Sequence, residues 1–306
     1  MQSKNKSFYL VLFFKSVLMG TVNKLPGISG GLVALLTGFY VEMINSLKKL
    51  NLKFLKLLVQ LKFKELDKRF NIHFLIVIFF GILVSYFTTS QLLDFLFVKY
   101  ELQVWSTFFG MILASNIILI AGNRKWNLNS FLSIFLGLII GILISISEPT
   151  TENKNLLYVF FCGFVSICGM IIPGLSGSYL LIILGNFKLL LVDSVNAVYN
   201  SFLILLGIGS NLKHDIELLN IAIMFALGSI TGLLILSKIL SYLILNFNKT
   251  INQIIIGFVT GSLFIVWPWN YSNQNFEFNV QNLDNFLWMF FGLFIVLFFE
   301  RYATKK

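Results

Sequence analysis

The sequence predicts an all-α polytopic membrane protein with two inverted-topology repeats, each holding one re-entrant helical hairpin and three transmembrane helices. Composition is the first observation behind this prediction: 57% of the 306 residues are hydrophobic and only 12% are charged, against about 25% charged in soluble chains. The mean hydropathy is +0.86. The second observation is a series of long apolar runs, and the third is a phrase that occurs twice.

The apolar runs are continuous, which favours helices over barrel strands, in which apolar and polar residues alternate. A helix needs about 20 residues to cross a hydrocarbon core about 30 Å thick. Most runs are near this length. They lie at 8–25, 29–47, 72–90, 104–122, 129–146, 156–172, 176–192, 197–210, 218–236, 251–267 and 283–299.

The repeated phrase reads LPGISGGLVALLTG at 25–38 and IPGLSGSYLLIILG at 172–185. An offset of 147 residues superposes the two copies, and the same register continues without a gap. Glycine makes up only 22 of the 306 residues, so several glycine pairs at one offset indicate two homologous halves, which we place at 1–147 and 148–306. The pairs are Gly27 and Gly174, Gly30 and Gly177, Gly38 and Gly185, Gly81 and Gly228, and Gly110 and Gly257.

Basic residues predict how the halves are oriented, because cytoplasmic loops collect Lys and Arg. Lys4 and Lys6 precede the first hairpin, 8–47, and a strongly basic segment, 48–70, follows it. We therefore expect a cytoplasmic-side hairpin followed by an interfacial helix lying against anionic lipid. A stop-transfer charge cluster is the other interpretation of this segment. An odd number of spans then brings the chain to the outer side, where the second hairpin, 155–192, begins. This inverts the second half and leaves both termini in the cytoplasm.

The repeated phrase itself predicts two broken helices. A proline ends the preceding helix, glycines allow close backbone approach, and serine caps the helix that follows. Broken backbone at membrane depth is tolerated only inside protein or beside a wet cavity. Two helix N-termini at that depth would form an anion site for phosphate or carboxylate. The candidate binding residues are Gly27, Ser29, Gly30, Gly31, Gly174, Ser176, Gly177 and Ser178.

A full positive charge should assist, since a helix N-terminus contributes only about 0.3 to 2 kcal/mol. Lys24 directly precedes the first phrase and is the predicted phosphate partner, whereas Ile171 occupies its place in the second half, so the site is asymmetric. Lys15 either lines the route by which the phosphate enters or extends to the cytoplasmic interface. Asn23 and Glu42 are candidates for ion coupling, with a solvated interfacial carboxylate as the other interpretation of Glu42.

Other interpretations stay open at this point. Each hairpin could be two ordinary spans joined by a tight turn. The GISGG spacing at 27–31 fits a hydrolase nucleophile elbow, but that motif needs a strand before it and a histidine partner. The net charge of +10 lies in the loops and indicates topology rather than nucleic-acid binding. Cys162 and Cys168 predict no disulfide or metal framework, and nothing calls for a cofactor.

The chain resembles the polyprenyl-phosphate translocases formerly known as the domain of unknown function 368 family. The resemblance is carried by NKLPGISGG at 23–31, GFY at 38–40, GMILAS at 110–115, PGLSGS at 173–178 and WPW at 267–269. It departs where Asn23 stands in place of a common acidic residue and Leu32 in place of a frequent threonine.

This resemblance implies a bacterial inner-membrane flippase. It would return undecaprenyl phosphate from the outer to the inner leaflet for cell-wall and surface-polysaccharide synthesis. The implied partners are this lipid, the membrane lipids and a coupling ion, proton or sodium. A membrane lipid-phosphate phosphatase and a small-anion channel or transporter are the alternative functions.

Overall fold

The computed structural model describes residues 6–48, 60, 63–122, 127–146, 152–167, 169, 176–208, 215–271 and 280–303. These residues form helices joined by short turns and include no strand, which confirms the all-α prediction. Several loops used to predict orientation, Gly174, and most of the segment between 49 and 62 lie outside the described residues.

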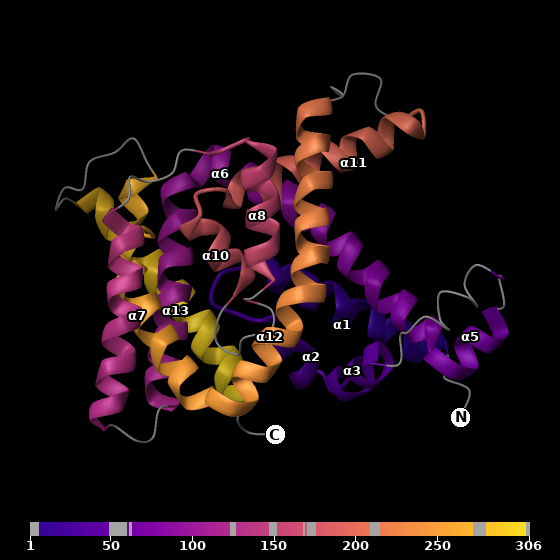
Figure 1. The fold of residues 1–306 in the computed structure, drawn as a ribbon. Helices are drawn as coiled ribbons and strands as arrows, with labels where there is room; N and C mark the ends of the chain where they lie inside the picture. Colours follow the sequence, from indigo (N-terminus) through magenta and orange to yellow (C-terminus); the bar gives the residue numbers. More distant parts are fainter. Residues whose placement is uncertain are drawn as a thin grey trace.

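The N-terminal part of the chain begins with a long helix, continues through short helices, and then enters a very long helix (Figure 1). Its helices are α1 (Lys6–Lys24), α2 (Gly30–Leu36), α3 (Tyr40–Lys48), α5 (Phe63–Phe70), α6 (Ile72–Gly122) and α7 (Leu128–Ile146). In α5, Leu66 and Phe70 are buried four residues apart on one helix face. This is the described end of the predicted interfacial helix 48–70.

The C-terminal part repeats this plan with a shorter first helix. Its elements are α8 (Leu156–Ser166), α10 (Gly177–Ile183), the π-helix η1 (Leu189–Asp193), α11 (Ser194–Leu205), α12 (Ile216–Ser262), the 3-10 helix η2 (Pro268–Asn270) and α13 (Val280–Ala303). In Figure 1, α11 extends sideways from the top of the bundle.

Several structural features recur at the offset of 147 residues found in the sequence. Helices α2 and α10 begin and end at positions that are 147 residues apart. Gly38 and Gly185, at the same offset, follow these helices with φ angles of 83° and 70°. The long helices leave helical geometry at Tyr100 and Phe247, again at this offset. The offset therefore relates local structure as well as sequence.

The second arm of each predicted hairpin is not a single helix, which corrects the predicted continuous runs 29–47 and 176–192. Helix α2 ends at Leu36, and α3 begins only at Tyr40. Between them Gly38 takes a positive φ, a conformation that commonly terminates helices and that glycine adopts without steric cost. Gly185 ends α10 in the same way.

The runs 72–90 and 104–122 were predicted as separate spans, yet both lie on the one helix α6. None of the residues between them is a proline or glycine, so backbone hydrogen bonding continues and the chain bends at Tyr100 instead of unwinding. Helix α12 joins the runs 218–236 and 251–267 in the same manner, with its bend at Phe247. Figure 1 shows both helices changing direction along their course.

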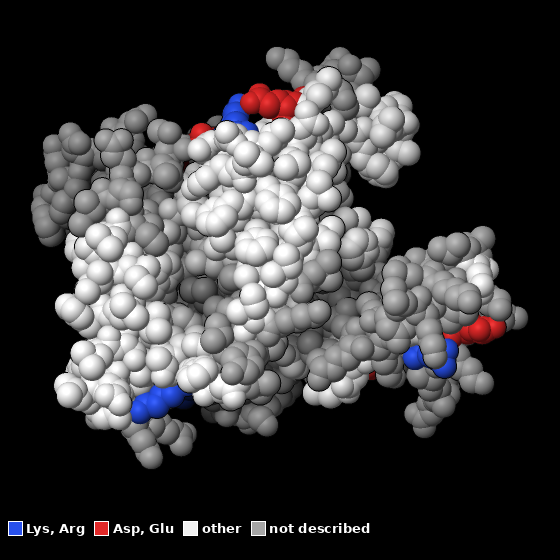
Figure 2. All heavy atoms as spheres, viewed as in Figure 1, with Lys and Arg blue, Asp and Glu red and all other residues white. Residues whose placement is uncertain are grey.

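Three stretches of the described residues are long and apolar enough to cross a membrane: Ile72–Gly122, Ile216–Leu233 and Leu283–Arg301. Shorter apolar helices are Leu128–Leu143, Leu156–Ser166 and Leu189–Leu205. Large apolar side chains on α6, α7 and α13 are exposed, for example Phe79, Phe135 and Phe294, as expected for surfaces that face lipid. In Figure 2 a broad uncharged band separates the charges at the top from those at the bottom and beside α5.

Glycines bring the helices of each half into close contact. A Cβ placed on Gly81 of α6 would collide with the Phe13 carbonyl of α1. A Cβ on Gly228 of α12 would likewise collide with the Phe160 carbonyl of α8. Both members of the second pair are 147 positions beyond the first. Small residues thus let the helix backbones touch. Such packing is common in membranes, because the hydrophobic effect does not drive helices together in lipid.

The last helix of each half packs on the long helix of the other half. Gly110 in the second arm of α6 lies against the Met289 carbonyl of α13. Gly257 in the second arm of α12 lies against the Ile134 carbonyl of α7. This exchange joins the two halves into one bundle around the repeated phrases.

Candidate functional site at the two repeated phrases

The first phrase turns sharply where α1 ends at Lys24. Pro26 is buried and stops the helix, and Gly27 follows with a φ of +85°. A Cβ on Gly27 would lie 2.5 Å from the carbonyl oxygen of Met111 in α6. Backbone conformation and close approach therefore both require glycine, and the turn rests directly on the second arm of α6.

Side chains of the phrase cap the start of α2. The Gly30 amide donates to Asn23 Oδ1 at 2.9 Å, and the Gly31 amide donates to Ser29 Oγ at 3.2 Å. A Cβ on Gly30 would collide with the Asn23 amide group, so the cap depends on this glycine. Asn23, predicted as a coupling candidate, is thus a helix-capping residue in this structure, and Ser29 lies at the predicted helix start.

The second phrase is capped by its own serines. Ser176 Oγ accepts from the Tyr179 amide at 3.2 Å and shares a hydrogen bond with Ser178 Oγ at 2.7 Å. Both serines are buried, and Gly177 begins α10 as predicted. Gly169, near the end of α8, packs so closely on the phrase that a Cβ there would lie 2.5 Å from the Ser176 carbonyl carbon.

Tyr179 adds a contact that sequence reasoning missed. Its hydroxyl shares a 2.5 Å hydrogen bond with Ser262 Oγ, at the end of α12. The equivalent position of the first phrase is Leu32, which has no hydroxyl. The two phrases therefore differ in their polar contacts as well as in charge.

Lys24 is fully buried and touches both halves of the chain. Its ammonium donates to the Tyr86 carbonyl at 2.7 Å, to the Leu191 carbonyl at 2.8 Å, and to Ser90 Oγ. The Tyr86 ring lies 4.7 Å from the ammonium. Tyr86 and Ser90 belong to α6, whereas Leu191 lies in the π-helix η1.

This environment leaves a positive charge without a counter-ion. Within the described ranges no carboxylate lies at ion-pair distance from Lys24. Removing an ammonium from water costs several kcal/mol, which neutral oxygens offset only in part. An anion that reached Lys24 would therefore bind favourably, but it would have to replace one of the three oxygens that the ammonium already holds.

Lys15 binds the far end of α2. Its ammonium donates to the Thr37 carbonyl at 2.7 Å, where a cation is favoured by the helix dipole. In the second half the Tyr158 hydroxyl donates to the Leu184 carbonyl at 2.9 Å, and Thr37 and Leu184 are 147 positions apart. These contacts hold the end of each short helix against the helix that precedes it.

The described hydrogen bond of Glu42 is made to Asn71 and not to either repeated phrase. Its Oε1 accepts from Asn71 Nδ2 at 2.7 Å, which ties α3 to the turn before α6. The phrases themselves are brought together by a contact between α1 and α10 and by the link from Lys24 to Leu191. Ser90 and Leu191 were not predicted as site residues. The hydroxyl-rich stretch 85–90 at the end of an apolar run could have indicated Ser90.

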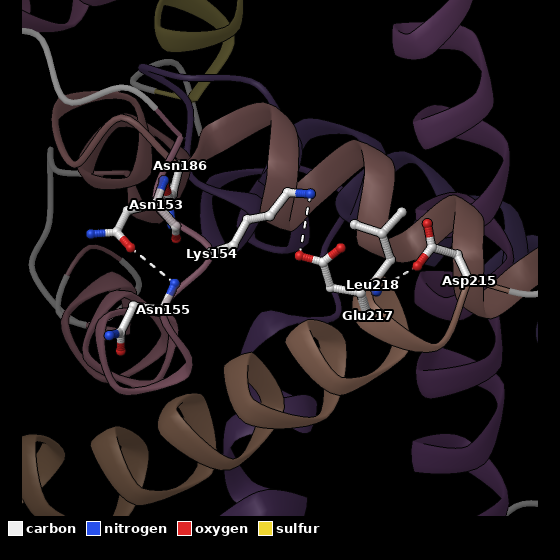
Figure 3. A network of polar contacts seen from close by, with 7 residues as sticks. All are labelled: Asn153, Lys154, Asn155, Asn186, Asp215, Glu217 and Leu218. Atoms are coloured by element: carbon white, nitrogen blue, oxygen red, sulfur yellow. Dashed lines mark hydrogen bonds and ion pairs between the residues drawn. The ribbon is translucent and has the colours of Figure 1, made fainter.

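A second polar cluster fastens the beginning of α8 (Figure 3). The Asn186 side chain accepts from the Asn153 amide and donates to the Asn153 carbonyl, both at 2.8 Å. Asn186 is fully buried. Next to it Lys154 forms a 3.3 Å ion pair with Glu217, and both side chains are more than half exposed. The buried amide is thus the firm attachment, since exposed ion pairs contribute little.

Comparison with known proteins decides the family. The family model of VCA0040-like proteins, described as undecaprenyl phosphate translocase-like, matches residues 19–283. The chain belongs to this family. The match contains both phrases, Lys24, Ser90 and Leu191, and it extends to the beginning of α13.

Two relatives of this chain carry the name polyprenyl-phosphate transporter. The protein from Vibrio cholerae serotype O1 is 29% identical over 261 residues, which cover 85% of this chain and 78% of the relative. The protein from Staphylococcus aureus is 27% identical over 277 residues, covering 86% and 88% respectively. No solved structure gives a significant match. The family and the long apolar helices together indicate a multi-pass membrane protein.

Proposed function

We propose that this protein is a flippase that returns undecaprenyl phosphate from the outer to the inner leaflet of the bacterial inner membrane. The carrier would then be available again for cell-wall and surface-polysaccharide synthesis. The observation that carries the proposal is Lys24, a fully buried ammonium that contacts both halves and pairs with no described carboxylate. Such a group suits a lipid whose only charge is its phosphate.

The hairpins of this proposal are re-entrant. Helices α2 and α10 have seven residues each, so each is about 10 Å long at 1.5 Å per residue. A hydrocarbon core is about 30 Å thick. A helix this short cannot cross the core by itself, which supports re-entrant hairpins over pairs of full spans. The contact between α1 and α10 supports their meeting inside the protein.

The two halves have opposite orientations in the membrane. Each half has one hairpin and an odd number of spans, once the long helices α6 and α12 are counted as two spans each. The equivalent bends at Tyr100 and Phe247 support this count. The basic segments support a cytoplasmic location for both termini, with the first hairpin on the cytoplasmic side and the second on the outer side. Inverted repeats of this kind allow alternating access.

The phosphate would lie between the phrases while the prenyl tail stays in lipid. Lys24 supplies the charge, and the residues Ser29–Gly31 and Ser176–Ser178 supply hydroxyl and amide groups. Because the amides of Gly30, Gly31 and Tyr179 already donate to side-chain caps, we assign charge recognition mainly to Lys24. Rocking of the halves would expose the site to each leaflet in turn, coupled to a proton or sodium ion.

The test is leaflet-resolved movement of undecaprenyl phosphate in proteoliposomes. We expect movement with the unchanged protein and its loss in Ser29→Leu and Ser176→Leu, because leucine fills the space beside each cap. Ser133→Leu, in α7 and outside both phrases, is the matched control and should retain movement. Phosphate release from the pyrophosphorylated carrier would instead identify a phosphatase. An anion current without lipid movement would identify a channel.

A further inference from the structure

The contacts of Lys24 join parts of the chain that are distant in sequence. Lys24 is bound to α6, in its own half, through the Tyr86 carbonyl and Ser90. It is bound to the other half only through the Leu191 carbonyl, at 2.8 Å, within the part of the chain that is described. Loss of this one contact would remove the described hydrogen bond between α1 and η1 while leaving Lys24 attached to α6.

Ser90 holds the same carbonyl. Its Oγ lies 2.8 Å from the Leu191 oxygen and 2.7 Å from the Tyr86 oxygen. A hydroxyl has a single proton, so Ser90 can donate to Leu191 or to Tyr86 but not fully to both. When Leu191 moves away, the Ser90 hydroxyl can therefore donate to the Tyr86 carbonyl instead.

The position of Leu191 fits a contact that opens. It lies in the π-helix η1, and π-helical turns are rare and frequently occur at functional sites. Leu191 itself is buried, and its carbonyl oxygen lies within hydrogen-bond distance of both Lys24 and Ser90 when the contact is closed. An anionic oxygen is a stronger acceptor for an ammonium than a carbonyl, and it could take the place of Leu191 at Lys24.

We propose that Lys24, Ser90 and the Leu191 carbonyl form a latch between the two halves, which the phosphate of the lipid carrier opens by replacing Leu191 at the Lys24 ammonium. This inference rests on the proposed function and adds how substrate binding is linked to movement of the halves. Ser90 is a positioning residue in this mechanism, because it stabilises the closed latch and does not bind the phosphate.

The latch predicts that Ser90→Ala binds the carrier more tightly than the unchanged protein does. The carrier can bind Lys24 only when the latch is open, so a stable closed latch weakens the apparent affinity for the carrier. Removing the Ser90 hydroxyl weakens the latch and leaves one Lys24 proton without its partner, so carrier affinity should rise. One hydrogen bond of ordinary strength corresponds to a Kd lowered by about two- to tenfold. A purely structural serine would lower thermal stability without tightening binding, and a serine that binds phosphate would weaken binding.

The experiment measures the Kd of undecaprenyl phosphate for the full chain in detergent, beside undecaprenol and inorganic phosphate as probes. Ser85→Ala is the matched control, because Ser85 is buried in the same arm of α6 and bonds Thr21 of the same half at 3.0 Å. It should leave the Kd unchanged. Ser90→Thr retains the hydroxyl and should restore the original Kd. Ser90→Cys replaces Ser90→Ala if the latter does not fold, with the same expected direction.

The outcomes separate the latch from the proposed function. If the unchanged protein binds undecaprenyl phosphate no better than undecaprenol, the proposed function and the latch both fall. If it binds the phosphate but Ser90→Ala binds equally or more weakly, the latch alone is overturned. Tighter binding by Ser90→Ala, with Ser85→Ala unchanged, supports the latch.

Discussion

Lys15 and Tyr158 donate hydrogen bonds to two carbonyl oxygens, those of Thr37 and Leu184, that occupy equivalent positions in the two halves of the chain. The donors differ in kind. Lys15 brings a full charge to the end of α2, whereas Tyr158 brings a neutral hydroxyl to the end of α10. The same structural need has therefore been met by different chemistry in each half.

Loss of these two donors should lower stability by different amounts. We expect Tyr158→Phe to cost about 0.5 to 1.5 kcal/mol, the net value of a neutral hydrogen bond. Lys15→Met should cost about 1 to 3 kcal/mol, because it also removes a charge from a helix C-terminus. Thermal unfolding in detergent measures both. Tyr199→Phe is the control, since the Tyr199 hydroxyl has no hydrogen bond within the described residues, and equal losses in all three variants would contradict the prediction.

Gly27 and Gly38 allow a separation of backbone strain from close packing. Their φ angles are nearly equal, +85° and +83°, but a Cβ on Gly27 would lie 2.5 Å from the Met111 oxygen, whereas one on Gly38 would meet nothing within 4 Å. Gly38→Ala should cost about 1 to 2 kcal/mol from strain alone. Gly27→Ala should add about 1 to 3 kcal/mol of overpacking. Thermal unfolding of the two variants gives the difference in stability. Equal losses would contradict the prediction, because they would mean that α6 can move away from the added methyl group without loss of stability.

The sequence predicted best what depends on local chemistry. The prolines, glycines and serines of the repeated phrase mark where α2 and α10 begin, because helix termination and capping involve residues only a few positions apart. The apolar runs likewise predicted where helices lie. Gly38 was visible in the repeat, but the helix break that it causes was not predicted, since the run around it is mostly apolar.

What the sequence could not predict are contacts between distant residues. The oxygens that hold Lys24 are 62, 66 and 167 positions away, and two of them are backbone carbonyls, which every residue possesses. No pattern of side chains marks such a carbonyl. The continuous helix through Tyr100 was missed for a different reason: charged residues at 94–101 separate the apolar runs 72–90 and 104–122, but none of those residues breaks a helix.

Asn23 should tolerate aspartate and not alanine. Its Oδ1 caps the Gly30 amide at 2.9 Å, and a carboxylate oxygen can accept the same hydrogen bond. We expect Asn23→Ala to cost about 0.5 to 2 kcal/mol. Asn23→Asp should be neutral or stabilising by about 0.3 to 1 kcal/mol, because a negative charge is favoured at a helix N-terminus. Thermal unfolding in detergent at neutral pH compares the two, and a loss in Asn23→Asp equal to that in Asn23→Ala would exclude capping as the role of Asn23.

Asn186 should matter far more to stability than the ion pair beside it. Its buried amide both accepts from and donates to the backbone of Asn153, so Asn186→Ala removes two hydrogen bonds and should cost about 1 to 3 kcal/mol. Asn186→Asp should lose much of the same energy, because a carboxylate cannot donate to the Asn153 carbonyl.

Glu217→Gln breaks the exposed pair with Lys154 and should cost less than about 1 kcal/mol. Thermal unfolding at low and high salt distinguishes the two attachments. The small effect of Glu217→Gln should vanish at high salt, since exposed charges are screened, whereas the effect of Asn186→Ala should persist. A large salt-sensitive loss in Glu217→Gln would reverse the order and make the ion pair the stronger attachment at the beginning of α8.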